Sequence, residues 1–316
     1  MAEPCVSVVI PAYKVARYIT ETLQSVMEQT YTDYEVIVVD QDRDAAMSRV
    51  LEPFAGRVVH VQQEPINVSV ARNAGSRRAR GRYIASLDGD DRWYPEYLAS
   101  LVPLAEGGLD VVYPNAVFFG HRDFEGSLFQ DHWPSKRPVD LCSILGRESN
   151  VFTSALVRRS IFEKVGGYNE RLNSSEDLDL WLRIAEAGGR FDFTPKPLVR
   201  QRLRSSSLSR GTINMCKTAI EVYTRYLEHA DAAVREAAGA AIQRSEAYLS
   251  LQASREHILA GDYQTARACL HRAARYYRSN RLRAVEVLLQ FVPFVLRWEL
   301  LRRNTRTSMR ARWRAD

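Results

Sequence analysis

The feature that most constrains the fold is an alternation, over residues 1–115, between short β-branched apolar runs and segments of helical periodicity. Such near-continuous apolar runs are typical of parallel strands buried on both faces. The predicted strands are 6–13, 34–40, 58–62, 83–88 and 110–115. The predicted helices between them are 16–29, 69–80 and 95–105. The chain is therefore predicted to begin with an α/β sheet that has helices on both faces.

After this region the sequence changes character twice. Residues 116–150 are rich in loop signals, and further strands are predicted at 152–159, 191–195 and 198–204, with an amphipathic helix at 176–188. A Ser-rich segment, 205–211, then forms a predicted break. Beyond it strand signals vanish, and helices are predicted at 212–229, 231–260, 263–278 and 281–303. We predict an α/β domain at 1–210 and an α-helical C-terminal domain at 211–316.

One turn within the helical part has a recognisable pattern. Gly261-Asp262 and the helix after it resemble one helix-turn-helix unit of a tetratricopeptide array, with Ala266 and Ala273 as small packing positions. One unit is not an array, so we predict a helical appendage and not a solenoid.

The formal net charge of +6 is concentrated at the C-terminus. Residues 271–316 hold twelve Arg against Glu286, Glu299 and Asp316, a balance of +9, which leaves −3 for residues 1–270. Tryptophan and leucine interleave with these arginines, which favours an interfacial helix on an anionic membrane over an arm that tracks nucleic acid. The apolar face of that helix is expected to gather Val287, Leu288, Phe291, Val292, Val295 and Leu296. A basic helix packed on the protein's own body is the alternative.

The cysteines and the N-terminus bear on the compartment. Cys5, Cys142, Cys216 and Cys269 are far apart and form no zinc-binding pattern, which is typical of a reduced compartment. The N-terminal apolar stretch has no basic region before it and is too short for a signal peptide. We therefore expect a cytoplasmic protein, associated peripherally at most with the cytoplasmic face of a membrane.

Three carboxylates, Asp88, Asp90 and Asp91, follow a predicted strand within four residues. Like charges this close repel unless a cation neutralises them, and hard divalent ions prefer such oxygen ligands. Mg²⁺ usually keeps waters and a substrate phosphate in its remaining positions, so the pattern suggests a metal-bridged diphosphate. The carboxyl ends of parallel strands are also where open α/β sheets bind ligands. An acidic turn without a metal is the alternative.

A second polar motif lies just upstream of these carboxylates. Arg72 and Asn73 stand near the opening of the predicted helix 69–80. Backbone N–H groups and a guanidinium at such a place favour an anionic group. We predict that both residues bind the same ligand as the carboxylates.

Six motifs, in this order, resemble those of the family 2 glycosyltransferases, which are inverting, nucleotide-sugar-dependent enzymes of the GT-A fold. They extend over about residues 5–210 and are VSVVIPAY (6–13), YEVIVVD (34–40), VARNAG (70–75), LDGDDRW (87–93), GGYNERL (166–172) and EDLDLWLR (176–183). The resemblance implies a GT-A (Rossmann-like) α/β fold, a mostly parallel sheet flanked by helices. In this chain an α-helical C-terminal region follows it.

The resemblance also assigns binding residues for a nucleoside diphosphate sugar. It implies that Pro11, Ala12, Tyr13 and Asp40 line the nucleoside pocket. It places Arg72 near the base or the phosphates, and we group Asn73 with it. It further implies that Asp88 and Asp90 form a DxD pair that holds the nucleotide ribose and a metal, Mg²⁺ or Mn²⁺.

Inversion by direct displacement requires one general base, which deprotonates the acceptor hydroxyl on the face opposite the leaving diphosphate. The family places the base in an ED pair at a helix start, here Glu176-Asp177, and we predict Asp177. The alternative is that these acids and Asp179 only complement the helix dipole, at about 0.3–1 kcal/mol each. Three acids in four residues exceed what capping requires, and Ser175 is expected to cap the helix.

Three positions depart from the family pattern. Gln41-Asp42-Arg43 follow Asp40 where the family often has a second Asp and then Gly-Ser, which leaves the base of the nucleotide open. Lys14 stands where Asn is frequent. Arg204 occupies the position of a late His, and a guanidinium cannot ligate a metal. Either the ion has fewer protein ligands, or Arg204 contacts the diphosphate itself.

The predicted function is metal-assisted transfer of a sugar to a glycan or lipid-linked acceptor at the cytoplasmic face of a membrane. A non-catalytic pseudo-glycosyltransferase that binds partners is the alternative; Arg204 and Gln41 favour it, whereas Asp88, Asp90 and Asp177 argue against it. A nucleotidyltransferase is disfavoured because no Gly-rich loop follows the first strand. No nucleic-acid partner is expected.

Overall fold

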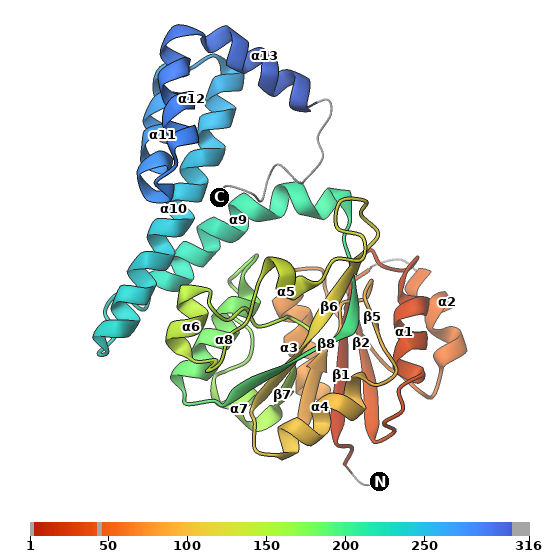
Figure 1. Cartoon of the computed structure of the whole chain (residues 1–316). Coiled ribbons are helices and arrows are strands. Elements are labelled where there is room, and N and C mark those ends of the chain that lie inside the picture. The colour runs from red at the N-terminus through yellow and green to blue at the C-terminus, as the bar shows by residue number, and fades with distance from the viewer. Residues whose placement is uncertain (1–2, 43–45, 305–316) are drawn as a thin grey trace. The chain divides into compact units, whose positions relative to one another are not determined.

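The computed structural model describes residues 3–42 and 46–304. The chain divides into two compact units, Met1–Ser207 and Leu208–Asp316. In Figure 1 the first contains a sheet with helices around it and the second is helical. The predicted division into functional domains at residue 210 stays a prediction.

One mixed sheet of eight strands organises the first unit, in the order β3-β2-β1-β4-β7-β6-β8-β5. The strands are β1 (Val6–Ala12), β2 (Tyr34–Asp40), β3 (Val59–Gln62), β4 (Tyr83–Ser86), β5 (Arg92–Trp93), β6 (Val111–Phe119), β7 (Leu156–Arg158) and β8 (Phe191–Arg202). Strand β1 pairs in parallel with β2 and β4, as do β2 with β3 and β6 with β8, whereas β5 and β7 pair antiparallel with their neighbours. The predicted α/β fold with a mostly parallel sheet is confirmed.

Helices of the first unit follow or separate these strands. They are α1 (Ile19–Met27), α2 (Ala46–Leu51), η1 (Glu52–Phe54), α3 (Val68–Arg78), α4 (Tyr97–Glu106), α5 (Phe129–His132), α6 (Leu141–Gly146), α7 (Arg159–Lys164) and α8 (Glu176–Glu186). All residues of β1 are buried, and α3 packs against β1 and β2. The apolar runs therefore became central strands because both of their faces are covered.

The largest difference from the sequence-based expectation in this unit concerns β8. It is one strand over Phe191–Arg202, where two strands were predicted at 191–195 and 198–204. Its pairing with β6 shifts register near Asn115, whose side-chain amide donates to the carbonyl of Pro195. This irregularity accommodates the two prolines, which lack the N–H needed for a regular ladder. The short strand β5 was not predicted.

The helical unit contains all but the first three residues of α9 (Ser205–Thr224), followed by α10 (Ala232–Ala260), α11 (Tyr263–Tyr277), α12 (Asn280–Phe291) and α13 (Pro293–Asn304). The Ser-rich segment 205–211, predicted as a break, is instead the first part of α9. The single helix predicted at 281–303 is two helices that meet at Val292, because Pro293 cannot continue the hydrogen-bond ladder. Among the described helices, none combines the length and the apolar character needed to span a membrane.

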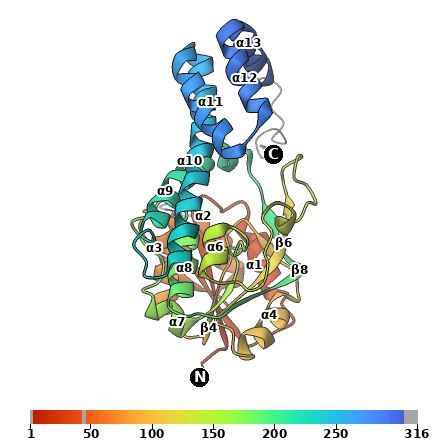
Figure 2. The same cartoon turned by 60° about the vertical axis from the view of Figure 1, so that its left-hand side comes forward.

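Helices α10 and α11 run side by side (Figure 2). Gly261 joins them in the left-handed region, with φ +87°, which permits the sharp turn. Ala266 and Ala273 of α11 are fully buried, as the resemblance to one tetratricopeptide unit predicted. Small side chains here allow the two helix backbones to approach closely.

Candidate functional site

The candidate site begins at the carboxyl ends of neighbouring strands β1, β2 and β4. Ala12, at the end of β1, is opposite Asp40, at the end of β2, and Ser86 ends β4 on the other side of β1. The residues predicted for the nucleoside pocket are therefore brought together. Pro11 and Ala12 are buried, whereas the Tyr13 ring is 49% exposed and is available to a ligand.

Asp40 is held inside the protein and not presented to solvent. Its side chain is 1% exposed, and Oδ2 lies 3.1 Å from Nε2 of His60. Its Oδ1 accepts the backbone N–H of Asp42 at 2.8 Å. The Asp42 carboxylate in turn accepts the backbone N–H of Lys14, which has φ +54°. Asp40 therefore orders the chain just after β1 and β2.

His60 and Gln41 belong to the same region and were not predicted as site residues. His60 lies in the edge strand β3, whose residues are all exposed or partly exposed, and only the pairing of β2 with β3 brings it to Asp40. Gln41 is buried and donates from Nε2 to the carbonyls of Glu64 and Asn67. Gln41 thus holds the segment that leads into α3.

The three carboxylates after β4 have three different environments. Asp88 has a side chain that is 38% exposed and faces Arg72. Asp90 is largely buried, and its Oδ2 lies 2.9 Å from Nε of Arg204. Burial and the charge of Asp88 raise the pKa of Asp90, although Arg204 opposes this shift. Of the three, Asp88 is the most open to a ligand or cation.

Asp91 has a structural role. It is buried, and its Oδ1 accepts the backbone N–H of Arg202 at 2.7 Å. Burial and the charges of Asp88 and Asp90 raise the pKa of Asp91 well above its ordinary value. Asp91 therefore ties the acidic turn to the end of β8.

Arg72 connects the acidic turn to helix α8. Its guanidinium donates from Nη2 to Asp88 Oδ1 at 2.8 Å and from Nη1 to Glu176 Oε1 at 2.7 Å. Burial disfavours the charged form, but Asp88, Tyr168 and Glu176 together raise the pKa of Arg72. The side chain is 3% exposed, so Arg72 lies beneath the site and joins its two acidic parts.

Asn73 uses its polar atoms within the protein. Its Nδ2 donates to the carbonyl of Tyr168 and to Glu170 Oε1, and its Oδ1 accepts the backbone N–H of Tyr168. A Cβ on Gly167 would lie 2.7 Å from Asn73 Oδ1, and Gly167 has φ +70°. These contacts explain why a glycine stands at position 167. They fix the segment that leads into α8.

The acids that open α8 are directed to three partners. Glu176 pairs with Arg72, and burial and the charge of Asp177 raise the pKa of Glu176. Asp179 is fully buried and pairs with Arg183 at 2.7 Å. Ser175 does not cap the helix as predicted, because it is in the left-handed region at φ +56° and its side chain accepts no capping hydrogen bond.

Asp177 is partly exposed, and its contacts are with neutral donors. Oδ2 accepts the hydroxyl of Thr153 at 3.0 Å, and Oδ1 accepts the backbone N–H of Leu178. Thr153 and Asp88 line the same recess, together with Ser86, Asp91, Phe152, Ser154 and Gln201. The recess therefore joins the acidic turn to the hydroxyl that holds Asp177.

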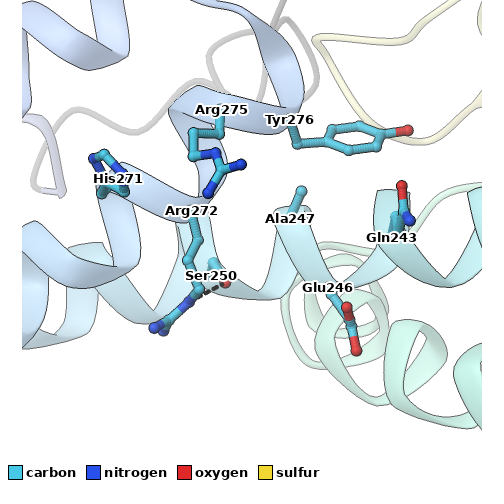
Figure 3. A pocket seen from close by; sticks show the side chains of 8 residues that line it. All are labelled: Gln243, Glu246, Ala247, Ser250, His271, Arg272, Arg275 and Tyr276. Carbon is cyan, nitrogen blue, oxygen red and sulfur yellow. Dashed lines mark hydrogen bonds between the residues drawn. The ribbon is translucent and has the colours of Figure 1, made fainter.

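A separate groove of about 470 Å³ lies between α10 and α11 of the helical unit (Figure 3). Its lining side chains are mostly polar and exposed, and Arg272 donates to the hydroxyl of Ser250 there. The groove contains none of the site residues predicted from the sequence.

Comparison with known proteins gives the chain a family context. The family model described as glycosyl transferase family 2 matches residues 7–166. Chondroitin synthase of Escherichia coli is 30% identical over 193 residues, which cover 58% of this chain and 27% of that protein. That relative is therefore much longer than this chain.

Solved structures share the fold across almost the whole chain. Staphylococcus aureus TarS, residues 1–349, in complex with UDP-GlcNAc matches with a TM-score of 0.63 and 18% identity, covering 93% of this chain and 88% of that one. The mannosyltransferase PcManGT of Pyrobaculum calidifontis, in complex with GDP-Man and Mn²⁺, matches with a TM-score of 0.58 and 20% identity, covering 95% and 85%.

Proposed function

Because the chain belongs to glycosyl transferase family 2, we propose that it moves a sugar, with inversion, from a nucleoside diphosphate sugar to a glycan or lipid-linked acceptor. One observation carries the proposal. Arg72 donates to both Asp88 and Glu176, and so joins the acidic turn after β4 to the acidic start of α8. Two carboxylate groups with separate tasks are what metal-assisted inverting transfer requires.

The donor part of the proposal is supported by the solved relatives. TarS was solved in complex with UDP-GlcNAc and PcManGT in complex with GDP-Man. Both ligands are nucleotide sugars, but their bases differ. For this chain we assign the nucleoside to the pocket at Pro11, Ala12 and Tyr13, with Asp40 and His60 ordering its rim. The base of the nucleotide is left open because Gln41 points to backbone carbonyls.

The donor set at the acidic turn fits a divalent metal. Asp88 and Asp90 offer two carboxylates, and burial of Asp90 next to Asp88 leaves a charge that a cation would stabilise. Among the described residues no cluster of three metal-ligating side chains occurs. An Mg²⁺ or Mn²⁺ ion held by these two carboxylates would take its remaining ligands from diphosphate and water. Such an ion would neutralise charge on the leaving diphosphate.

Asp177 is the general base in this proposal. It accepts the proton of the acceptor hydroxyl, the acceptor oxygen bonds to the anomeric carbon, and the bond to the diphosphate oxygen breaks on the opposite face. Glu176 is less suited because its carboxylate is bound by Arg72. The hydroxyl of Thr153, a residue that also lines the recess beside Asp88, donates to Asp177 and holds its carboxylate. Arg204 is close enough to the acidic turn to bind a phosphate oxygen after leaving Asp90.

A glycan acceptor is supported by the similarity to chondroitin synthase. A lipid-linked acceptor would require the enzyme to work at a membrane surface. We include a peripheral location at the cytoplasmic face of a membrane in the proposal, with the helical unit as the part that makes the contact.

A thermal-shift screen tests the donor part. Uridine, guanosine, adenosine and cytidine diphosphates are compared with and without Mn²⁺, because a ligand that binds only the native state raises the melting temperature. We expect one nucleotide to raise it more with Mn²⁺ than alone. An Asp90→Ala variant should fold, and its melting temperature should no longer rise further when Mn²⁺ is added with the nucleotide. The absence of a shift with every nucleotide would contradict an active glycosyltransferase and favour the pseudo-enzyme.

A further inference from the structure

Large apolar side chains are exposed in a row on the last two described helices. Each helix contributes three of them: two adjacent residues and a third residue about one turn later. Their side chains are between 44% and 74% exposed. We call this set the apolar face: Val287, Leu288 and Phe291 of α12, and Phe294, Val295 and Trp298 of α13. Val292, which joins the helices, is 38% exposed.

The apolar face is not needed for the core of the helical unit. That core contains Ile258, Ala266, Leu270 and Leu289, and other apolar residues of α12 and α13 pack against it, namely Leu282, Val285, Leu296 and Leu300. Each helix therefore has an inward row and a separate outward row. The expectation that Leu296 belongs to the exposed face is wrong, because Pro293 starts a new helix and turns Phe294 and Trp298 outward in its place.

Contiguous exposed apolar surface rimmed by charge marks an interaction site. The charge of the two helices that carry this face indicates the partner. Helices α12 and α13 contain five Arg against Glu286 and Glu299, an excess of +3. A second copy of the chain would bring the same positive excess and be repelled, whereas an anionic bilayer attracts it by about 1 kcal/mol for each basic residue near the surface.

We propose that the apolar face is a membrane-contact surface that inserts into the headgroup region of an anionic bilayer. Each of the two helices has 12 residues, or about 18 Å at 1.5 Å per residue. A spanning helix must cover about 30 Å, so these helices lie on the bilayer and do not cross it. Trp298 suits the interface because its indole has an apolar body and a polar N–H.

This inference rests on the proposed function in one respect: the membrane contact would bring the enzyme to a lipid-linked acceptor. The contact itself involves α12 and α13, whereas the donor site belongs to the first unit. Membrane binding and nucleotide binding can therefore fail separately.

Vesicle sedimentation with the full chain tests the inference. We expect binding to vesicles that contain phosphatidylglycerol, little binding to pure phosphatidylcholine, and a loss of binding at high salt. The double variant F291S/F294S should lose about tenfold or more in vesicle affinity, because two phenyl rings that would enter the bilayer are removed. Leu227→Ser, which changes a 41% exposed residue outside the apolar face, is the matched control and should bind like the wild type.

Four further measurements keep the outcomes distinct. Circular dichroism should be the same for F291S/F294S and the wild type, and the melting temperature should fall only slightly, because both side chains are largely exposed and the lost contact is that of the Phe294 ring with the Tyr263 ring. Nucleoside diphosphate binding should also be unchanged. The inference is wrong if the protein binds anionic and neutral vesicles equally well, or if F291S/F294S binds vesicles as tightly as the wild type. It is also wrong if wild-type protein without lipid is a dimer that F291S/F294S dissociates, since the face would then be covered by a second copy.

Discussion

Arg204 lies against Asp90, with its Nε 2.9 Å from Asp90 Oδ2. The carboxylate that was predicted from the sequence to bind a metal is therefore already paired with a guanidinium. Burial and the nearby Asp88 disfavour the charged form of Asp90, and Arg204 reduces this cost. A divalent ion bound as proposed would therefore compete with Arg204 for the same carboxylate. A nucleoside diphosphate would offer Arg204 another anionic partner, which would make donor and metal binding mutually favourable.

Removing Arg204 should change this competition. In Arg204→Gln, we expect Mn²⁺ alone to bind about tenfold more tightly than in the wild type, because Asp90 is no longer paired. Without metal, the nucleoside diphosphate should bind this variant more weakly than the wild type, because the guanidinium that would bind a phosphate oxygen is missing. Calorimetric titration of Mn²⁺ and of the nucleotide, each alone and then together, measures both effects.

Arg200→Gln is the matched control for this experiment. Arg200 belongs to β8 and lies over the Phe119 ring, without a carboxylate partner among the described residues. Its replacement should leave Mn²⁺ affinity unchanged. If the wild type binds Mn²⁺ alone as tightly as Arg204→Gln does, Arg204 does not compete with the metal.

Asp177→Asn tests the general base. The amide keeps the shape of the side chain and an oxygen that can accept from Thr153, but it cannot take a proton at neutral pH. We expect kcat to fall by about 10²–10⁴ with little change in donor affinity. Steady-state kinetics and nucleotide titration measure the two quantities. Near-normal turnover in Asp177→Asn, together with its loss in Glu176→Gln, would assign the base to Glu176.

Arg72 should be important for stability as well as for the site. Replacement by Met leaves Glu176 buried without its cation, which costs about 3–5 kcal/mol of unfolding free energy for a broken buried pair. Arg77→Met is the control in the same helix. Arg77 is 62% exposed and lies 3.6 Å from Glu170, so its loss should cost at most about 1 kcal/mol. Urea unfolding of both variants compares them, and equal costs would show that the buried connection is not stabilising.

The sequence was sufficient for the parts of the fold that local pattern determines. Strands β1 and β2 were predicted within one residue because their apolar runs are nearly continuous. Strand β5 was missed because its two residues become a strand only by pairing with β8, more than a hundred positions away. Helix α9 was predicted to start late, since Ser-rich composition favours loops.

The candidate site shows the same division. The carboxylates Asp88 and Asp90 could be located because their spacing along the chain is itself the signal. The partners of Arg72 could not be located, since Glu176 is 104 positions away and only the tertiary fold brings it to Arg72. His60 beside Asp40 depends likewise on the pairing of β2 with β3. Tertiary contacts therefore decide which polar residues face a ligand and which support it.

Glu35 should give the first unit an acid-sensitive contribution to stability. Its carboxylate accepts the Ser7 hydroxyl and the backbone N–H of Arg80, both at 2.7 Å, and also the Arg80 guanidinium. Burial acts to raise the pKa of Glu35, but these hydrogen bonds outweigh it and lower the pKa from its ordinary value of 4.5. The contact joins β2 to the start of β1 and to the turn before β4.

The sign of the pH effect follows from this lowered pKa. Between the folded and the ordinary value the unfolded chain binds more protons, so the stabilisation by Glu35 is complete above about pH 4.5 and is lost as the pH falls through the folded pKa. Glu35→Gln should cost about 1–3 kcal/mol at neutral pH, from hydrogen bonds to a charged group, and the difference from wild type should shrink below pH 4.5. Urea unfolding across the pH range measures it, with the exposed Glu28→Gln as control. A difference that stays constant down to the acid limit would show that the charge of Glu35 is not what stabilises the fold.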